Sequence, residues 1–289
     1  MEIESLEKER ISVKNNLIIL YIILSVVGIV LFLFLSILVF PFIIVLFVIG
    51  MLMTNIISKK YKMMYKNNFV YSVLNKYFNN LVYKPNEGLS ESVIYNTKMM
   101  NTFDRYNSED YISASYKDIK FIQSNVHIEQ MQVTTDGNGH TRTSYVTIFL
   151  GSWMIFEFNK EFKSKLQVVE KGFSGAINNS LFEKKYKRVE FEDIEFNKSF
   201  NVYATSEHEA FYILTPSFIE KIKKLNELVR GSIILCFIDN SLHFGLNSSK
   251  DTFEPKIFRK INEDDVIHDL KVITHFIDEL DLDNTLFKK

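Results

Sequence analysis

The chain has 289 residues with 34 basic and 35 acidic side chains, and its single cysteine is Cys236. This balance argues against a nucleic-acid-binding protein, because such proteins carry an excess of basic residues to neutralise phosphates. One thiol excludes an internal disulfide, and the length is sufficient for a substantial folded domain.

The N-terminal part combines a charged leader, residues 1–16, with a long apolar stretch. We expect the leader to form a helical turn or two and to act as a solvated topology signal. Leu17–Ile57 contains no Lys, Arg, Asp, Glu or His. As one helix it would be about 60 Å long, against a hydrocarbon core of about 30 Å. We therefore predict a transmembrane helical hairpin over 17–57, with a turn near Ser36–Phe40 and Pro41 in the first turn of the second helix.

Basic residues flank this hairpin on both sides, whereas the predicted turn has none. The positive-inside rule then places both termini in the cytoplasm of a multi-pass membrane protein, and the absence of paired cysteines agrees with that side. A cleaved signal peptide is the competing interpretation, but its apolar region is only about 7–15 residues long and ends in small residues. We expect four lysines after the hairpin to contact lipid headgroups: Lys59, Lys60, Lys62 and Lys66.

Residues 58–84 predict a juxtamembrane amphipathic helix, because Phe69, Val73, Tyr77 and Leu81 recur every four residues. Either the following domain or a second such helix at the membrane could cover this apolar face. Turn residues from Pro85 end the helix, so we place a cytoplasmic domain at 85–289.

Within this domain the first half predicts antiparallel strands. A short helix opens at Ser90, and Phe103–Tyr111 is predicted to be a polar loop with aromatic residues. Alternating apolar residues then favour strands, and Asp-Gly and Asn-Gly in the segment Thr134–His140 are typical of a hairpin tip. The expected strands are Tyr111–Tyr116, Ile119–Gln132, Thr143–Phe149, Trp153–Phe158 and Lys165–Lys171.

The second half predicts short strands at Arg188–Phe191 and Phe200–Tyr203, then helices with recognisable N-caps and one hairpin. Ser206 begins a capping-box pattern, and Thr215-Pro216 is typical of a helix start. The sequence from Ser232 to Leu246 predicts a hairpin that turns at Asp239, and Asn262–Leu280 predicts a final helix. The expected fold class is therefore α+β, with a helical hairpin before a domain of antiparallel strands and amphipathic helices.

The sequence contains none of the common phosphate-loop, nucleophile-elbow or zinc-hydrolase motifs, so we predict no catalytic, cofactor-binding or metal-binding residues. Cys236 lies in an apolar strand and is expected to be a buried structural thiol. His268 and His275 share a helix face that favours a solvated stripe over a metal site. The basic segments Lys160–Lys165 and Lys184–Arg188 are either solvated turns or bilayer contacts.

One cluster of charged residues between aromatic residues is our candidate binding loop, with an ion-paired structural loop as the alternative. Its members are Asp104, Arg105, Glu109 and Asp110.

Several segments together resemble a bacterial membrane-protein family known as domain of unknown function 3137. They are FDRYNSEDYISASYKDIKF (Phe103–Phe121), FEFNKEF (Phe156–Phe162), FNVYATSEHEAFYILTPSFIEKI (Phe200–Ile222), IILCFIDNSLHFGL (Ile233–Leu246) and DTFEPKIF (Asp251–Phe258). The resemblance covers most of the chain after the hairpin and implies no activity, so no site residue transfers from it. The tip around Gly137 departs most from the family pattern, and we expect no function there.

These observations favour a membrane-anchored, non-enzymatic module that binds the bilayer through Leu17–Ile57 and interacts with a protein partner or forms a homo-oligomer. A domain that binds lipid headgroups or a small ligand at the inner leaflet is one alternative. An enzyme with an unrecognised site is the other.

Overall fold

The computed structural model describes residues 3–35, 40–137, 139–158, 161–173 and 186–280 and divides into two compact units. Unit 1 comprises Met1–Val73 and Phe253–Asp265, and unit 2 comprises Leu74–Thr252 and Val266–Lys289. The units therefore differ from the expected domains at 17–57, 58–84 and 85–289. The chain passes between them inside a helix, and a segment from the C-terminal part, Phe253–Asp265, belongs with the helical hairpin. We call this segment the strap.

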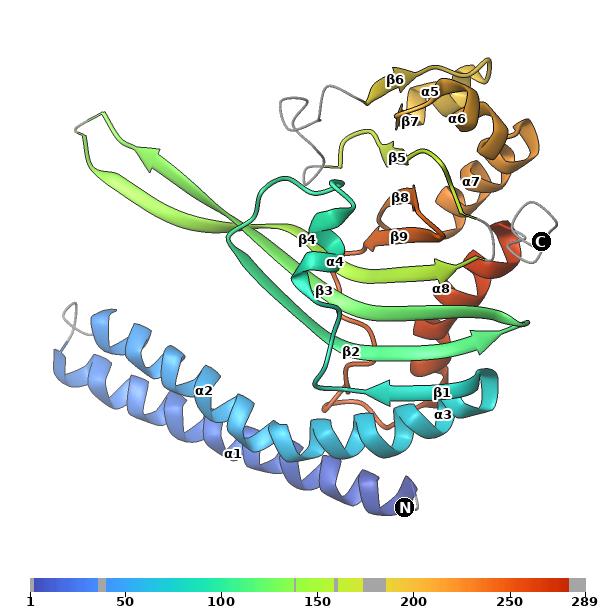
Figure 1. The fold of residues 1–289 in the computed structure, drawn as a ribbon. Coiled ribbons are helices and arrows are strands. Elements are labelled where there is room, and N and C mark those ends of the chain that lie inside the picture. The colour runs from blue at the N-terminus through green and yellow to red at the C-terminus, as the bar shows by residue number, and fades with distance from the viewer. Residues whose placement is uncertain (1–2, 36–39, 138, 159–160, 174–185, 281–289) are drawn as a thin grey trace. The chain divides into compact units, whose positions relative to one another are not determined.

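Unit 1 is built on two helices, α1 (Ile3–Leu35) and α2 (Phe40–Met64), which confirm the expected hairpin (Figure 1). Both are long and apolar enough to cross a membrane. Most of the expected turn, residues 36–39, lies outside the described residues.

The leader is helical from Ile3 onward, so the expectation of only a turn or two was too short. It contains no Gly or Pro, and nothing in its composition stops the helix. Leu6, Arg10 and Val13 are buried at helical spacing, which makes the expectation of a solvated leader wrong for this face.

After α2 the helix continues through a π-helical segment, η2 (Tyr65–Val70), and then through α3 (Tyr71–Tyr77). The single helix expected over 58–84 is wrong at its end, because Asn79–Lys84 forms strand β1. Asn80 has a positive φ of 53°, a conformation that ends a helix and that asparagine tolerates better than most residues. The residues after it pair with the next strand instead.

Unit 2 contains a nine-stranded sheet in which all pairings are antiparallel, with the order β1-β2-β3-β4-β9-β8-β5-β7-β6 (Figure 1). This architecture confirms the expected α+β class. The remaining strands are β2 (Arg105–Tyr116), β3 (Ile119–Thr135), β4 (Thr141–Glu157), β5 (Leu166–Glu170), β6 (Lys187–Val189), β7 (Phe200–Ala204), β8 (Ser232–Ile238) and β9 (Ser241–Asn247).

The polar loop expected at Phe103–Tyr111 is wrong, because most of it forms the first half of β2. Its polar side chains are satisfied by the neighbouring structure. Tyr106 donates a hydrogen bond to the Leu89 carbonyl at 2.8 Å, and Ser108 donates one to the Asn125 carbonyl at 2.8 Å. Such contacts come from distant segments, so the local pattern did not indicate a strand.

The two strands expected at Thr143–Phe149 and Trp153–Phe158 are one continuous strand, β4, which ends at Glu157. Gly151, which suggested a break, instead allows a close approach of β9. A Cβ atom there would lie 2.1 Å from the Leu246 carbonyl oxygen. The glycine is therefore required by packing within the sheet.

The helices of unit 2 are α4 (Glu91–Asn96), α5 (Ile194–Ser199), α6 (Glu207–Ile213), α7 (Pro216–Leu228) and α8 (Glu263–Leu280), the last of which begins in unit 1. The predicted N-caps are confirmed, since Ser206 accepts from the Glu209 amide and Thr215 from the Phe218 amide. Helix α5 was not expected.

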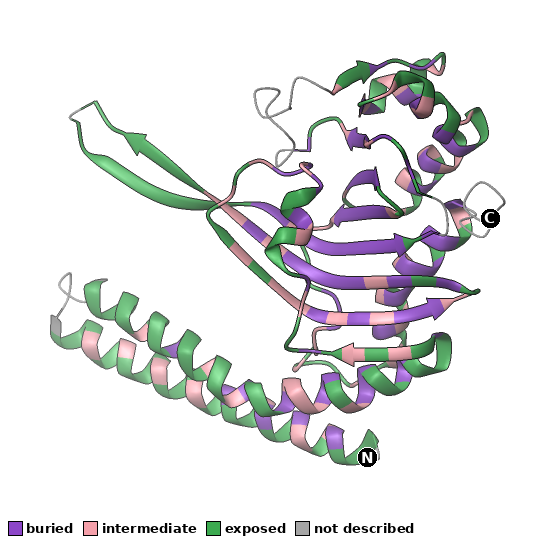
Figure 2. Cartoon of the chain, viewed as in Figure 1, coloured by how far each residue is buried: buried purple, intermediate pink, exposed green. Residues whose placement is uncertain are grey.

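The sheet is covered on both faces. Phe276 of α8 stacks on Phe156 and Phe244, whose side chains point to one face. Ile94 of α4 belongs to a second core with Trp153 and other residues on the opposite face. Successive side chains of a strand point to opposite faces and so enter different cores. The strands in the middle of the sheet are therefore buried at consecutive positions, as in β8 and β9 (Figure 2).

Candidate functional site

The four residues of the expected binding loop do not form one loop. Asp104 and Arg105 lie where β2 begins, whereas Glu109 and Asp110 lie at a bulge in the middle of β2. The expectation of a single loop is therefore wrong, and the two pairs have different surroundings.

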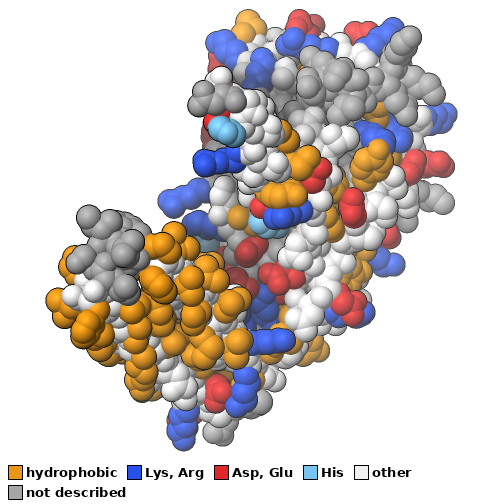
Figure 3. Space-filling view, turned by 90° about the vertical axis from the view of Figure 1, so that its left-hand side faces the viewer, with side chains coloured by type: hydrophobic (Ala, Val, Ile, Leu, Met, Phe, Trp, Pro, Cys, Tyr) orange, Lys and Arg blue, Asp and Glu red, His pale blue; other side chains and the backbone are white. Residues whose placement is uncertain are grey.

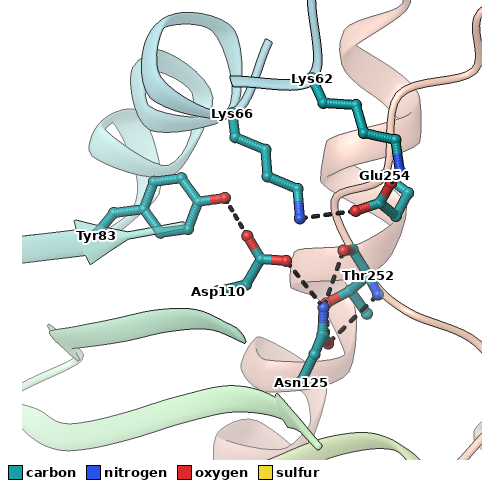
Figure 4. Close-up of polar contacts among 7 residues, drawn as sticks. All are labelled: Lys62, Lys66, Tyr83, Asp110, Asn125, Thr252 and Glu254. Carbon is teal, nitrogen blue, oxygen red and sulfur yellow. Dashed lines mark hydrogen bonds and ion pairs between the residues drawn. The ribbon is translucent and has the colours of Figure 1, made fainter. Parts of the chain in front are cut away.

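Asp110 is fully buried and has a positive φ of 57°. The Tyr83 hydroxyl donates to its Oδ1 at 2.6 Å, and the Asn125 amide donates to its Oδ2 at 3.1 Å (Figure 4). Asn125 in turn accepts a 2.7 Å hydrogen bond from the Thr252 hydroxyl. This network joins β1, β2 and β3 to the segment after β9, which indicates a structural role for Asp110.

Asp104 and Arg105 support the start of a projecting feature of the sheet. The Asp104 carboxylate accepts a hydrogen bond from the Met131 amide at 2.7 Å. The Arg105 guanidinium lies 3.3 Å from the centroid of the Tyr145 ring and 3.6 Å from the Glu129 carboxylate. A cation over an aromatic face is attracted to it, so these residues hold β3 and β4 at the point where they leave the sheet.

Beyond this point β3 and β4 continue together as a two-stranded extension, which we call the ribbon: Met131–Thr135 and Thr141–Thr147 (Figure 1). Pairing with β2 ends at Glu129, and pairing with β9 begins only at Gly151. Every residue of the ribbon is exposed (Figure 2). Its outer edges therefore pair with no other strand among the described residues.

The ribbon carries apolar side chains that remain in solvent. Met131 and Tyr145 lie opposite each other and are 43% and 40% exposed, and Val133 is 55% exposed. Sequence reasoning predicted the hairpin but missed this surface. Alternating apolar residues usually mean a buried face, and only the strand order shows that, among the described residues, no further strand pairs with the ribbon.

In unit 1, α1 and α2 expose apolar side chains around most of their surface, and hydrophobic residues gather over them in the space-filling view (Figure 3). Only 6% of the most apolar segment of the first helix and 11% of that of the second are buried. The helices contact each other through a 2.9 Å hydrogen bond between Tyr21 and Thr54 and through Gly50, where a Cβ atom would lie 3.1 Å from Leu24. Small residues and polar pairs of this kind are typical of membrane helix contacts.

The four lysines expected at the membrane surface divide into two kinds. Lys59 and Lys60 are exposed, and Lys60 pairs with Glu9 at 2.9 Å. Lys66 is only 4% exposed and pairs with Glu254 of the strap at 2.7 Å, and Lys62 pairs with the same carboxylate at 2.9 Å (Figure 4). The expectation of a surface contact is therefore wrong for Lys66.

The strap is held to the helices of unit 1 by buried charges. Burial would raise the pKa of Glu254, but Lys66 and Lys62 outweigh burial and lower that pKa below its usual value. Arg10 donates to the Ile257 carbonyl at 2.6 Å and also to the Glu7 carboxylate at 2.7 Å. The hydrogen bond from Arg10 lowers the pKa of Glu7 below its usual value. These contacts give the leader, the end of α2 and η2 a shared packing partner.

The remaining expected residues occupy ordinary structural positions. Cys236 is fully buried and burial raises its pKa to about 12, which confirms a structural thiol. His268 and His275 are exposed on α8. Lys187 and Arg188 are exposed on β6, whereas Lys160, Lys184 and Lys185 lie outside the described residues.

A groove of about 1000 Å³ lies along α5, α7 and α8 of unit 2. Two of its lysines are paired with nearby carboxylates. Lys223 pairs with Asp193 at 2.8 Å, and Lys224 pairs with Glu279 at 2.7 Å. These ion pairs join the helices to one another, so the groove presents a mixed charge rather than a site for a ligand of one sign.

Comparisons with known proteins give a family-model match to part of the chain and indicate no activity. No curated protein matches the chain significantly. The crystal structure of the mycobacterial trehalose monomycolate transport factor A, TtfA, aligns with 75% of this chain and 94% of that chain, at 9% identity and a TM-score of 0.42. A likeness at this level carries no argument about function.

The match to a family model covers residues 147–282, and the family is described as "Protein of unknown function (DUF3137)". Four of the five segments that carried the resemblance lie inside this range, and Phe103–Phe121 lies outside it. The match confirms the resemblance, and residues 147–282 are similar to the DUF3137 family.

Proposed function

We propose that this protein is a membrane-anchored interaction module. The α1–α2 hairpin holds it in the bilayer with both termini in the cytoplasm, and the ribbon binds a protein partner. The observation that carries the proposal is the ribbon itself, a two-stranded extension whose faces and outer edges are exposed although it bears apolar side chains.

The anchor is supported by the cost of leaving the hairpin in water. Phe32, Phe34 and Phe47 are 60%, 84% and 68% exposed, and many aliphatic residues of α1 and α2 are exposed to a similar degree. Burying one such side chain in an apolar phase is worth about 1.5–3 kcal/mol. Over two helices the gain reaches tens of kcal/mol, which favours insertion over a solvated hairpin. Basic residues at both ends favour cytoplasmic termini.

The ribbon is supported as a binding element by its edges. A two-stranded ribbon is marginally stable in water by itself. Here it is continuous with the sheet and braced by Asp104 and Arg105. Natural proteins usually protect an exposed edge with lysine, proline or inward-pointing charge, and Arg142 is the one charged residue of the ribbon. An unprotected edge suits recognition by strand addition, in which main-chain hydrogen bonds provide the affinity.

Photo-cross-linking in cells tests the proposal. A photoreactive benzoylphenylalanine replaces Val133 on the ribbon, and a matched control carries it at His268, an exposed position on α8. We expect a covalent protein adduct from position 133 and none from position 268. No adduct at 133, or the same adduct from both positions, would contradict the proposal.

Lipid contact by Lys59 and Lys60 is a second, compatible proposal, because both are exposed directly after the apolar stretch. A lysine near an anionic leaflet is worth about 1 kcal/mol. Lys59→Gln with Lys60→Gln should therefore reduce the preference of the full chain for anionic over neutral vesicles in a flotation assay. An unchanged preference would refute this contact.

A further inference from the structure

The two outer edges of the ribbon are not equivalent. At the base of the β3 edge, the Met131 amide donates to Asp104 and the Gln130 side chain donates to the Thr102 carbonyl. Along Thr141–Thr147 of β4, no strand pairs with the outer edge among the described residues. The β4 edge is therefore the more open template for another strand.

We propose that this edge pairs with the same edge of a second copy of the chain, antiparallel and about a two-fold axis at Ser144. The proposal rests on the proposed function, for which it names the partner. It would join two ribbons into one four-stranded sheet, with the same residues contributed by each copy, as a two-fold interface requires.

The β4 sequence is compatible with itself in this register. The segment reads TRTSYVT, so Ser144 faces Ser144, Thr143 faces Tyr145 and Thr141 faces Thr147. Arg142 faces Val146, which keeps the two arginines of the dimer apart. Hydroxyl pairs and aromatic pairs with β-branched residues stabilise neighbouring strands, whereas like charges directly opposite destabilise them. Pairing between identical edges thus meets no electrostatic penalty.

The size of the edge explains why anchoring matters. Seven residues at about 3.4 Å each extend over about 24 Å. The area that one strand edge of this length buries is smaller than the roughly 800 Å² per partner of a stable complex. Two soluble copies would therefore associate weakly. Confinement to one bilayer raises the effective concentration of the copies, in the same way that a linker does.

Cross-linking in vesicles tests the pairing. The native Cys236 is fully buried, so an introduced cysteine is the reactive thiol. Full-length Ser144→Cys, reconstituted in phosphatidylcholine vesicles at low protein density, should form at least tenfold more covalent dimer on oxidation than Lys250→Cys, an exposed control outside the ribbon. Equal dimer from both variants would overturn the proposal.

A charge exchange provides the second measurement. Energy transfer between donor-labelled and acceptor-labelled Lys250→Cys chains should be lost when both carry Ser144→Lys, and it should return when Ser144→Lys chains are mixed with Ser144→Glu chains. Transfer that is insensitive to these charges would overturn the pairing. If the pairing fails while position 133 still cross-links to a protein of different mass, the module binds another protein and the proposed function stands. Failure of the chain to float with the vesicles would instead refute the anchor.

Discussion

The stability of unit 2 should fall in mild acid because of one buried histidine. His243 lies on β9, 7% exposed, and accepts a hydrogen bond at its Nδ1 from the Trp153 indole nitrogen at 3.3 Å. Nδ1 must be unprotonated to accept this bond, so the neutral form is the one that fits the core. Burial lowers the pKa of His243 from 6.5 to about 4. Protonation below pH 6.5 therefore favours the unfolded chain.

The size of the effect follows from these two pKa values. The free energy of unfolding is unaffected by His243 protonation well above pH 6.5 and falls as the pH is lowered from 6.5 toward 4. The total loss is about 3 kcal/mol. Between pH 7.5 and pH 5.5 the loss is about 1 kcal/mol. This window lies above the ordinary titration range of carboxylates, so His243 dominates it.

The assay uses the only tryptophan of the chain, Trp153, whose fluorescence reports on the core around His243. Urea unfolding of the full chain in detergent gives the free energy of unfolding at both pH values, for the wild type and for His243→Gln, which keeps an acceptor but does not titrate. We expect the wild type to lose about 1 kcal/mol more than the variant. Equal losses in the two proteins would refute the reasoning.

Three substitutions in unit 2 test other parts of the account by the same titration, with the exposed Lys250→Ala as a control near zero. Asp110→Ala removes the acceptor of the Tyr83 hydroxyl and should cost about 2–3 kcal/mol; a cost within error of the control would contradict a structural role. Gly151→Ala places a Cβ atom 2.1 Å from the Leu246 oxygen and should shift the midpoint to lower urea, whereas a stabilised variant would show that β9 does not approach so closely. Thr215→Ala should cost about 1 kcal/mol through the lost cap of α7, and no cost would mean that this cap is not formed.

Features encoded within a few neighbouring residues were predictable from the sequence. The absence of charge over Leu17–Ile57 predicted the hairpin, and the caps at Ser206 and Thr215 predicted the starts of α6 and α7. Lys117 and Asp118, the two residues between the strands expected at Tyr111–Tyr116 and Ile119–Gln132, both have positive φ, as the tightest hairpin turns require. In each case the determining contacts are local, so one segment contains the information.

Features that depend on distant segments were missed. The first half of β2 is polar and shows no alternation of apolar residues that would predict a strand. Its side chains form hydrogen bonds with Leu89 and with Asn125 of β3, which are distant in the sequence. By its position after the hairpin, Lys66 was expected to contact headgroups. It pairs instead with Glu254 of the strap, almost 190 residues later in the chain. The exposure of the ribbon follows from where β2 and β9 stop pairing, which is a property of the sheet order.

The central claim is that a two-span hairpin anchors this protein with both termini inside the cell, and cysteine labelling in intact cells tests it most directly. Ser36→Cys, in the connection between the two helices, should react with a membrane-impermeant maleimide added outside, whereas Ser5→Cys should react only after the membrane is permeabilised. Buried Cys236 provides an unreactive background. Labelling of Ser5→Cys in intact cells, or protection of Ser36→Cys until permeabilisation, would contradict the claim.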